Sequence, residues 1–313
     1  MCYQILVTAL IPQESKAKIP DDFVVDYFTK KRPMSNHELL HQVTQNNYDA
    51  ILCTYEDRID ESLLKAAGER LKIISVMSNG IENVDIKACQ AYGVTVTNVP
   101  GVTTDAIADY AIALLLIGIR RLDRYIHQNY DPVTPYYLGN LQGLAVAQLT
   151  IGIVGMGKIG SAIAKRLVGF DSRIIYYSRQ QKPELEKQCF LQYLSLDRLL
   201  VEADAVIVCC SLNDSTHNMF ASESFKLMKS SAIFINLARG AICNHQDLYI
   251  ALKQRLISMA LLDVTDPEPL PPNHLLYHLD NCLIFPHIAT NTIDSRLEVC
   301  NLALQNILKT LKT

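Results

Sequence analysis

Residues 149–179 constrain the fold of this chain more than any other segment. An apolar run leads into Gly155-Met156-Gly157-Lys158-Ile159-Gly160, and an amphipathic stretch and a second apolar run (173–177) follow. In this context the first glycine permits a tight turn, the second lets the backbone approach a pyrophosphate, and the third lets the helix pack on the strand. The helix then presents unpaired N–H groups and its positive dipole end to the phosphates. The segment therefore predicts a β-α-β unit that binds a dinucleotide through residues 155–160.

The rest of the chain repeats the alternation of strand-like and helical segments. We expect strands at 3–8, 23–28, 50–54, 71–76 and 94–98 before the glycine turn, and at 205–210, 232–236, 259–264 and 282–285 after it. Such alternation is typical of parallel sheets with helices on both faces. A length of 313 residues fits two domains. Near Pro100 the pattern changes, and residues 105–121 predict an almost wholly apolar helix that is deeply buried or lies at a subunit interface.

Composition excludes several function classes. A net charge of −3 and a pI near 6.2 offer no positive surface for nucleic acid or an anionic membrane. The nine cysteines show no zinc-ligand spacing, and their odd number is typical of reduced thiols in a cytosolic compartment. The N-terminus shows no secretory signal, and the longest apolar run, 111–119, is too short to span a bilayer. We therefore expect a cytoplasmic protein without a metal, nucleic-acid or membrane partner.

Three side chains that can do chemistry follow strand-like runs downstream of the glycine turn: Arg239, Glu268 and His287. Ligands of open parallel sheets bind beyond the carboxyl ends of the strands. Arginine can hold a carboxylate by two parallel hydrogen bonds. Histidine can donate a proton near neutral pH, and a carboxylate on its other ring nitrogen keeps it protonated and oriented. Taken alone, Arg239 favours a functional role, whereas Glu268 is better explained as a solvated loop acid and His287 as a structural residue. Together the three match hydride chemistry on a 2-oxo acid.

Ser178 and Arg179 bear on which dinucleotide is bound. Ser178 follows the second strand of the unit, where an acidic residue would accept from the ribose 2′-OH and repel a 2′-phosphate. Serine removes that repulsion, and Arg179 can pair with the phosphate. The segment predicts NADPH as the preferred cofactor. The alternative, a simple polar turn that tolerates NADH, stays open.

Over nearly its full length the sequence resembles the D-2-hydroxyacid dehydrogenases. The resemblance is carried by the GMGKIG turn and by residues 236–240, 263–270, 286–288 and 101–109. Residues 177–180, 234–236 and 262–271 resemble most closely the glyoxylate/hydroxypyruvate reductases within that family. The resemblance implies an α/β fold of two doubly wound, Rossmann-like domains with a cleft between them. Residues 1–99 and 287–313 would form the substrate-binding domain, and residues 100–286 the dinucleotide-binding domain, through which most members form homodimers.

The resemblance also implies individual roles. Arg239 would bind the substrate, His287 would act as acid/base and Glu268 would pair with His287. The backbone of Ser78-Asn79-Gly80 would grip the substrate. Asp263 would contact the nicotinamide side, and further residues of the cofactor site would be Thr104, Ser211 and Ala238.

Three departures from the family pattern concern the substrate pocket. Asn79 stands where an apolar residue is expected, and Ala289-Thr290-Asn291 replaces Gly-Ser-Ala after His287. The chain has no Trp, so it lacks the tryptophan that relatives contribute to the other subunit of the dimer. We expect Tyr136 or Tyr137 to take its place. These changes leave the identity of the 2-oxo acid open.

The sequence thus predicts an NADPH-dependent reductase of glyoxylate or hydroxypyruvate that yields the D-2-hydroxy acid. One alternative is another D-2-hydroxyacid or phosphonate-type dehydrogenase on the same scaffold. A formate dehydrogenase would require Gln in place of Glu268. A second class is the non-enzymatic corepressor that senses NAD(H), in which an acidic residue is expected at position 178.

Overall fold

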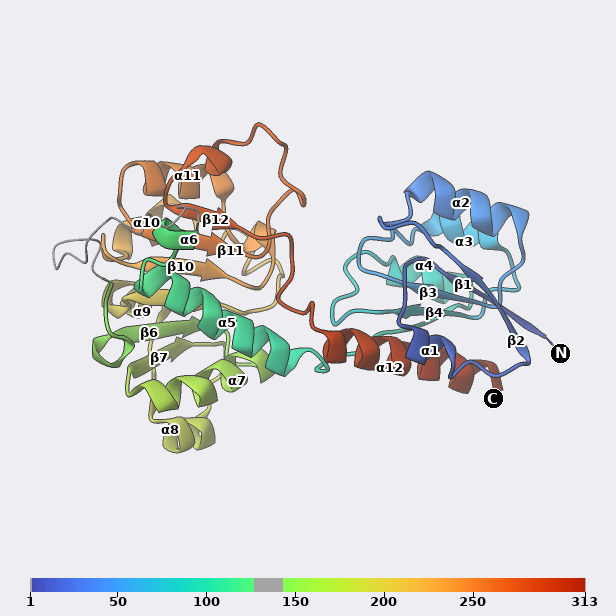
Figure 1. The fold of residues 1–313 in the computed structure, drawn as a ribbon, viewed down its shortest axis with the longest axis horizontal. Coiled ribbons are helices and arrows are strands. Elements are labelled where there is room, and N and C mark those ends of the chain that lie inside the picture. Colours follow the sequence, from blue (N-terminus) through green and yellow to red (C-terminus); the bar gives the residue numbers. More distant parts are fainter. Residues whose placement is uncertain (1, 127–142, 313) are drawn as a thin grey trace, which may run out of the picture. The chain divides into compact units, whose positions relative to one another are not determined.

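The computed structural model describes residues 2–126 and 143–312, which form two compact units (Figure 1). One unit consists of Met1–Thr103 and Asn291–Thr313, and the other of Thr104–Thr290. These boundaries lie a few residues after those expected at 99/100 and 286/287. Tyr136 and Tyr137 lie outside the described residues. Among the described helices, none combines the length and apolarity needed to cross a membrane.

The first unit is built on a five-stranded parallel sheet of order β2-β1-β3-β4-β5. Alternate residues of a strand point to opposite faces, so Leu6 enters the core under one face, and Ile5 and Val7 enter the core under the other. The strands are β1 (Tyr3–Val7), β2 (Phe23–Tyr27), β3 (Ala50–Cys53), β4 (Ile73–Val76) and β5 (Thr95–Thr97).

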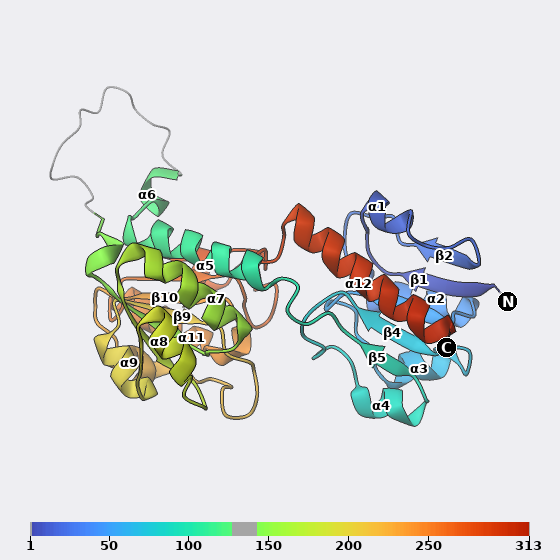
Figure 2. The same ribbon diagram turned by 90° about the horizontal axis from the view of Figure 1, so that it is seen from below.

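Helices cover both faces of this sheet (Figures 1 and 2). Helices α2 (Asn36–Gln45), α3 (Glu61–Ala67) and α4 (Ile86–Ala91) pack on one face, and α1 (Gln13–Lys16) and α12 (Ile293–Lys312) cover the other. Ser75 of β4 donates to the carbonyl of Ala303 in α12 at 2.9 Å. The last helix of the chain is therefore an integral part of the first unit.

The second unit contains a seven-stranded parallel sheet of order β12-β11-β10-β9-β6-β7-β8. The order reverses at β6, the strand before the glycine turn, and ligands bind at such switch points. The strands are β6 (Thr150–Val154), β7 (Arg173–Tyr177), β8 (Leu191–Tyr193), β9 (Ala205–Val208), β10 (Ile233–Asn236), β11 (Met259–Leu262) and β12 (Cys282–Ile284).

Two hydrophobic cores sandwich this second sheet. The helices on one face are α5 (Thr104–Ile119), α7 (Lys158–Leu167) and α8 (Pro183–Cys189), and those on the other are α9 (Leu196–Glu202), α10 (Ser222–Leu227) and α11 (His245–Lys253). Shorter elements are α6 (Asp123–Ile126) and the 3₁₀ helices η1 (Val146–Gln148), η2 (Val168–Phe170), η3 (Gly240–Ile242) and η4 (Leu275–His278). The two units confirm the predicted fold class of parallel sheets with helices on both faces.

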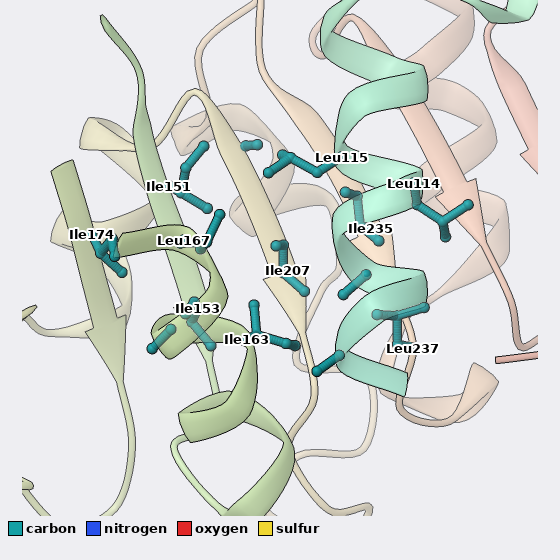
Figure 3. Packing of buried hydrophobic residues seen from close by; sticks show 14 of the residues in the cluster. Leu114, Leu115, Ile151, Ile153, Ile163, Leu167, Ile174, Ile207, Ile235 and Leu237 are labelled. Atoms are coloured by element: carbon teal, nitrogen blue, oxygen red, sulfur yellow. The ribbon is translucent and has the colours of Figure 1, made fainter. Parts of the chain in front are cut away.

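Helix α5 is held down on the sheet by large aliphatic side chains. Leu114 and Leu115 are at most 1% exposed and belong to the same core as Ile207 and Ile235 (Figure 3). A Cβ at Gly118 would lie 3.0 Å from Ile233 Cδ1 and 3.1 Å from Leu261 Cδ1, so any larger residue here would require these two side chains to shift. Burying one such leucine contributes about 1.5–3 kcal/mol. The apolar stretch predicted from the sequence is thus a core helix of the second unit.

Candidate active site

The glycine turn has the shape that a pyrophosphate requires. Gly155 has a φ of +102°, and a Cβ there would lie 2.6 Å from the Cys210 nitrogen. A Cβ at Gly160 would overlap the carbonyl oxygen of Gly155, so helix α7 can pack on β6 only with glycine here. A Cβ at Gly157 would meet nothing within 4 Å, which leaves open space beside the N-cap of α7. The first amides of a helix have no intrahelical acceptor. These residues therefore fit the pyrophosphate of a dinucleotide.

The side chains of the turn divide between the core and the surface. Met156 is 3% exposed and belongs to the core, so only its backbone is offered to a ligand. Ile159 packs partly against the same core, whereas Lys158 is exposed. Lys158 is therefore the one residue of the turn that presents a charge.

Ser178 and Arg179 lie beside the glycine turn, because the Gly155 amide donates to the Tyr177 carbonyl at 2.8 Å. The Ser178 hydroxyl donates to the carbonyl of Gln180 at 2.6 Å, which closes the turn after β7. Arg179 is exposed, and within residues 2–126 and 143–312 no carboxylate forms an ion pair with it. Arg179 thus follows β7 at the edge of the sheet that carries the glycine turn.

The end of β9 also reaches the glycine turn. The Cys209 thiol donates to the Gly155 carbonyl at 3.1 Å, and Ser211 follows two residues later. The Ser211 carbonyl accepts from Thr216 Oγ1 at 2.8 Å, which fixes the start of the loop. Thr104, another predicted residue of the cofactor site, is the first residue of α5, a helix tied to α7 through the ion pair of Arg166 and Asp109 at 2.6 Å.

His287 and Glu268 form an ion pair, with His287 Nδ1 2.6 Å from Glu268 Oε1. The second carboxylate oxygen accepts from the Thr265 amide at 3.2 Å. Burial alone would raise the pKa of Glu268, but the hydrogen bond and charge of His287, the Thr265 amide and the charge of Arg239 outweigh it and lower that pKa. Glu268 is therefore a carboxylate at neutral pH. Its contact with Nδ1 orients the imidazole ring of His287.

Asp263 supports the turn that carries His287. His287 has a left-handed backbone (φ 53°), and its amide donates to the Asp263 carbonyl at 3.0 Å. The Asp263 carboxylate is 1% exposed and accepts from the amides of Ile288 and Ala289, both at 2.9 Å. Sequence reasoning missed this supporting role. The signal for it was that Asp263 directly follows an apolar strand, because a carboxylate that is buried there needs hydrogen-bond donors around it.

Tyr110 of α5 is a second residue that sequence reasoning missed. Its hydroxyl is buried and lies beside the Asp263 carboxylate. Its ring meets that of Phe285 edge-on, with the centroids 6.0 Å apart. Burial, followed by the charge of Asp263, raises the pKa of Tyr110. Tyr110 therefore stays protonated beside Asp263.

Arg239 lies on a turn that packs directly against the Glu268 loop. The side chain of Asn236 clamps this turn, because Oδ1 accepts from the Ala238 amide at 3.1 Å and Nδ2 donates to the Arg239 carbonyl at 3.0 Å. A Cβ at Gly240 would overlap the backbone of Thr265, so glycine is required for the contact. The structure thus brings Arg239, Glu268 and His287 to one edge of one sheet.

The loop 78–80 belongs to the first unit and follows β4. Each of its three carbonyls accepts a hydrogen bond: Ser78 from the Val99 amide at 3.1 Å, Asn79 from Asn98 Nδ2 at 2.7 Å, and Gly80 from the Ser78 hydroxyl at 2.5 Å. In the described part of the chain, the amides of Asn79 and Gly80 donate to no acceptor. The Asn79 side chain is exposed. The loop therefore offers backbone donors rather than acceptors.

Comparison with known proteins identifies the family. Residues 112–289 match the NAD-binding domain of D-isomer specific 2-hydroxyacid dehydrogenases. The chain is 37% identical to a glyoxylate reductase/hydroxypyruvate reductase of Mus musculus over 99% of this chain and 95% of the relative. It is 35% identical to a glyoxylate reductase of Korarchaeum cryptofilum over 97% and 92% of the two chains. A solved glyoxylate reductase from Paecilomyes thermophila superimposes with a TM-score of 0.83 at 25% identity, over 100% and 96% of the two chains.

These matches agree with the dinucleotide turn, the ion pair of Glu268 and His287, and the neighbouring Arg239. They confirm the predicted family and the prediction of an enzyme that uses a nicotinamide cofactor. The chain belongs to the D-isomer specific 2-hydroxyacid dehydrogenase family of NAD(P)-dependent oxidoreductases.

Proposed function

We propose that this enzyme reduces glyoxylate or hydroxypyruvate to the D-2-hydroxy acid with NADPH. The observation that carries the proposal is the 2.6 Å ion pair between Glu268 and His287, at the same sheet edge as Arg239 and the glycine turn. Relatives named glyoxylate reductase, 35–37% identical over nearly the whole chain, support the substrate class. The departures at Asn79 and Thr290 leave the choice between the two acids to experiment.

In the proposed mechanism this chain supplies the proton and holds the substrate. When bound, the cofactor supplies a hydride for the carbonyl carbon. Arg239 binds the substrate carboxylate by two hydrogen bonds and draws electron density from the neighbouring carbonyl. His287 Nε2 donates a proton to the carbonyl oxygen, so the carbonyl gains one hydride and one proton and becomes a hydroxyl. Glu268 holds Nδ1–H throughout and stabilises the protonated imidazole before transfer.

Each unit has a proposed part in binding. The second unit would hold the dinucleotide through the amides of the 155–160 turn, with Thr104, Ser211, Ala238 and Asp263 as further contacts. The first unit would bind substrate through the amides of Asn79 and Gly80, since adjacent backbone N–H groups bind anions. Arg179 would pair with the 2′-phosphate of NADPH, because position 178 holds no carboxylate to repel it.

We further propose a cytoplasmic homodimer. All nine cysteines are free thiols, as in a reducing compartment. The almost wholly apolar helix α5 leaves Ile112, Leu116 and Ile117 only partly buried, which favours cover by a second copy. Light scattering coupled to size-exclusion chromatography would reveal a mass near twice 35.1 kDa for a dimer.

A panel of 2-oxo acids with both cofactors tests the proposed function. We expect the highest kcat/KM with glyoxylate or hydroxypyruvate and NADPH, and D-glycerate as the product from hydroxypyruvate. A higher kcat/KM with another 2-oxo acid would replace the substrate assignment. A wild-type preference for NADH would overturn the cofactor assignment.

A further inference from the structure

The loop 78–80 owes its donor character to the segment after β5. In a trans peptide unit the C=O and the N–H point in opposite directions. A hydrogen bond that fixes the carbonyl of one residue therefore also fixes the direction of the next residue's N–H. The Ser78 carbonyl is captured by the Val99 amide at 3.1 Å, which turns the Asn79 N–H away from this segment. The Asn79 carbonyl is captured by Asn98 Nδ2 at 2.7 Å, which turns the Gly80 N–H the same way. Two neighbouring amides thus point to one side, an arrangement that binds anions.

The two hydrogen bonds that fix the carbonyls of Ser78 and Asn79 differ in kind. The bond from Val99 to Ser78 is backbone to backbone and lies beyond Ser75 and Thr97, the last paired residues of β4 and β5. The bond from Asn98 to Asn79 comes from a side chain, so a single substitution can remove it. The Ser78 hydroxyl completes the loop by donating to Gly80. The direction of the Gly80 amide therefore depends on the carboxamide of Asn98.

Asn98 is itself tied to the body of the first unit. Its carbonyl accepts from Asn306 Nδ2 of α12 at 3.4 Å. The preceding residue, Thr97, donates to Ser75 Oγ at 3.0 Å, and Ser75 donates to the Ala303 carbonyl of α12 at 2.9 Å. A chain of polar contacts thus runs from α12 through β5 to the loop. The Asn98 side chain is the last link before the loop.

We infer that Asn98 is a positioning residue for the carboxylate of the substrate, because its carboxamide holds the Gly80 amide in the direction that receives the anion. The inference rests on the proposed function, in which the amides of Asn79 and Gly80 bind a 2-oxo acid. Asn98 touches the loop and not the reacting atoms. Its loss should weaken binding of the ground state and the transition state alike, which raises KM and leaves kcat nearly unchanged.

The test compares Asn98→Ala and the isosteric Asn98→Asp with a matched control, Asn46→Ala. Asn46 is exposed, lies in the same unit and also donates from Nδ2 to a backbone carbonyl, that of Gln42 at 3.3 Å. We expect both Asn98 variants to raise KM for the 2-oxo acid about tenfold, the size of one lost hydrogen bond, with kcat changed less than about twofold. The dissociation constant of oxamate, an amide analogue of a 2-oxo acid, should rise by the same factor in calorimetry. The control should change neither value.

A second measurement keeps the inference separate from the proposed function. Amide order parameters of Asn79 and Gly80, from NMR relaxation of the ligand-free protein, should fall in Asn98→Ala and stay unchanged in Asn46→Ala. If the wild type neither reduces 2-oxo acids nor binds oxamate, the proposed function is wrong. The role of Asn98 in substrate binding is then wrong as well. Unchanged order parameters in Asn98→Ala, or an unchanged KM in an active enzyme, would overturn the positioning role itself. Thermal melts of all variants establish that each is folded.

Discussion

Asp263 and His287 are joined through backbone and side chain together: the His287 amide donates to the Asp263 carbonyl at 3.0 Å, and the Asp263 carboxylate holds the next two amides at 2.9 Å. Replacing Asp263 by Asn would place the side-chain NH2 group of Asn opposite one of those backbone amides, so that two hydrogen-bond donors would face each other. A buried donor left without an acceptor costs about 1–3 kcal/mol. We expect Asp263→Asn to lower the melting temperature and kcat together, whereas Asp280→Asn, on the exposed pair with Arg255, should leave both near wild type.

His287→Ala removes the proposed proton donor. General acid catalysis contributes about 10²–10⁴-fold to rate, so kcat should fall by that factor. Binding of NADPH, followed by the fluorescence of the reduced nicotinamide, should persist because the glycine turn is untouched. Activity close to wild type would show that another group supplies the proton.

Glu268→Gln tests the ion pair through its pH dependence. The pKa of Glu268 is lowered in the folded protein, so its ionised form stabilises the fold above the unfolded value of about 4.5, and this contribution is lost as the pH falls through the lower folded value. The difference in unfolding free energy between wild type and Glu268→Gln should therefore be largest near neutral pH and shrink below about pH 4.5. Urea denaturation across that range measures it. A difference that grew on acidification would contradict the lowered pKa.

Arg179→Ala tests the cofactor assignment. Loss of a charge-assisted hydrogen bond to a phosphate should lower kcat/KM with NADPH at least about tenfold. The value with NADH should barely change, because NADH has no 2′-phosphate. Arg198→Ala, which removes an exposed arginine paired with Glu202, serves as the control. Equal losses with both cofactors would argue against a phosphate contact.

The glycine turn permits a test that separates binding from folding. A methyl group at Gly157 meets nothing within 4 Å, whereas one at Gly160 overlaps the Gly155 carbonyl. Gly157→Ala should melt like wild type but bind NADPH more weakly, because the methyl group enters the space proposed for the pyrophosphate. Gly160→Ala should be destabilised by about 1–3 kcal/mol, as expected for overpacking. Unchanged NADPH affinity in Gly157→Ala would mean that the phosphates lie elsewhere.

The parts of the site that follow from local pattern could be predicted from the sequence. The glycine turn is specified by six consecutive residues, and Arg239, Glu268 and His287 each follow a recognisable strand. Parallel strands bring their carboxyl ends to one edge, so the grouping of these three side chains follows from the fold class.

Contacts that depend on three-dimensional register could not be predicted in this way. The bond from Asn98 to Asn79 joins residues 19 positions apart and exists because β4 and β5 pair in one particular register. The partners of Asp263 lie 25 and 26 residues away, on the far side of β12. The edge strand β8 has only three residues, too few for a clear alternation. Helix α12 shows an apolar face in its sequence, but this pattern does not show which sheet receives it; the family resemblance implied the first domain, and in the structure the helix packs on the sheet of the first unit.

The attachment of α12 has a consequence for how the chain matures during synthesis. The residues of the second unit are contiguous, whereas the first unit bonds Ser75 to Ala303 across 228 positions. One side of its sheet, including Ile5, Val7 and Leu52, gains the apolar cover of α12 only when the final helix leaves the ribosome. The second unit can therefore fold first, while the strands that emerged earliest wait with an uncovered face. A nascent chain stalled before residue 293 would be the form most prone to aggregate or to recruit a chaperone.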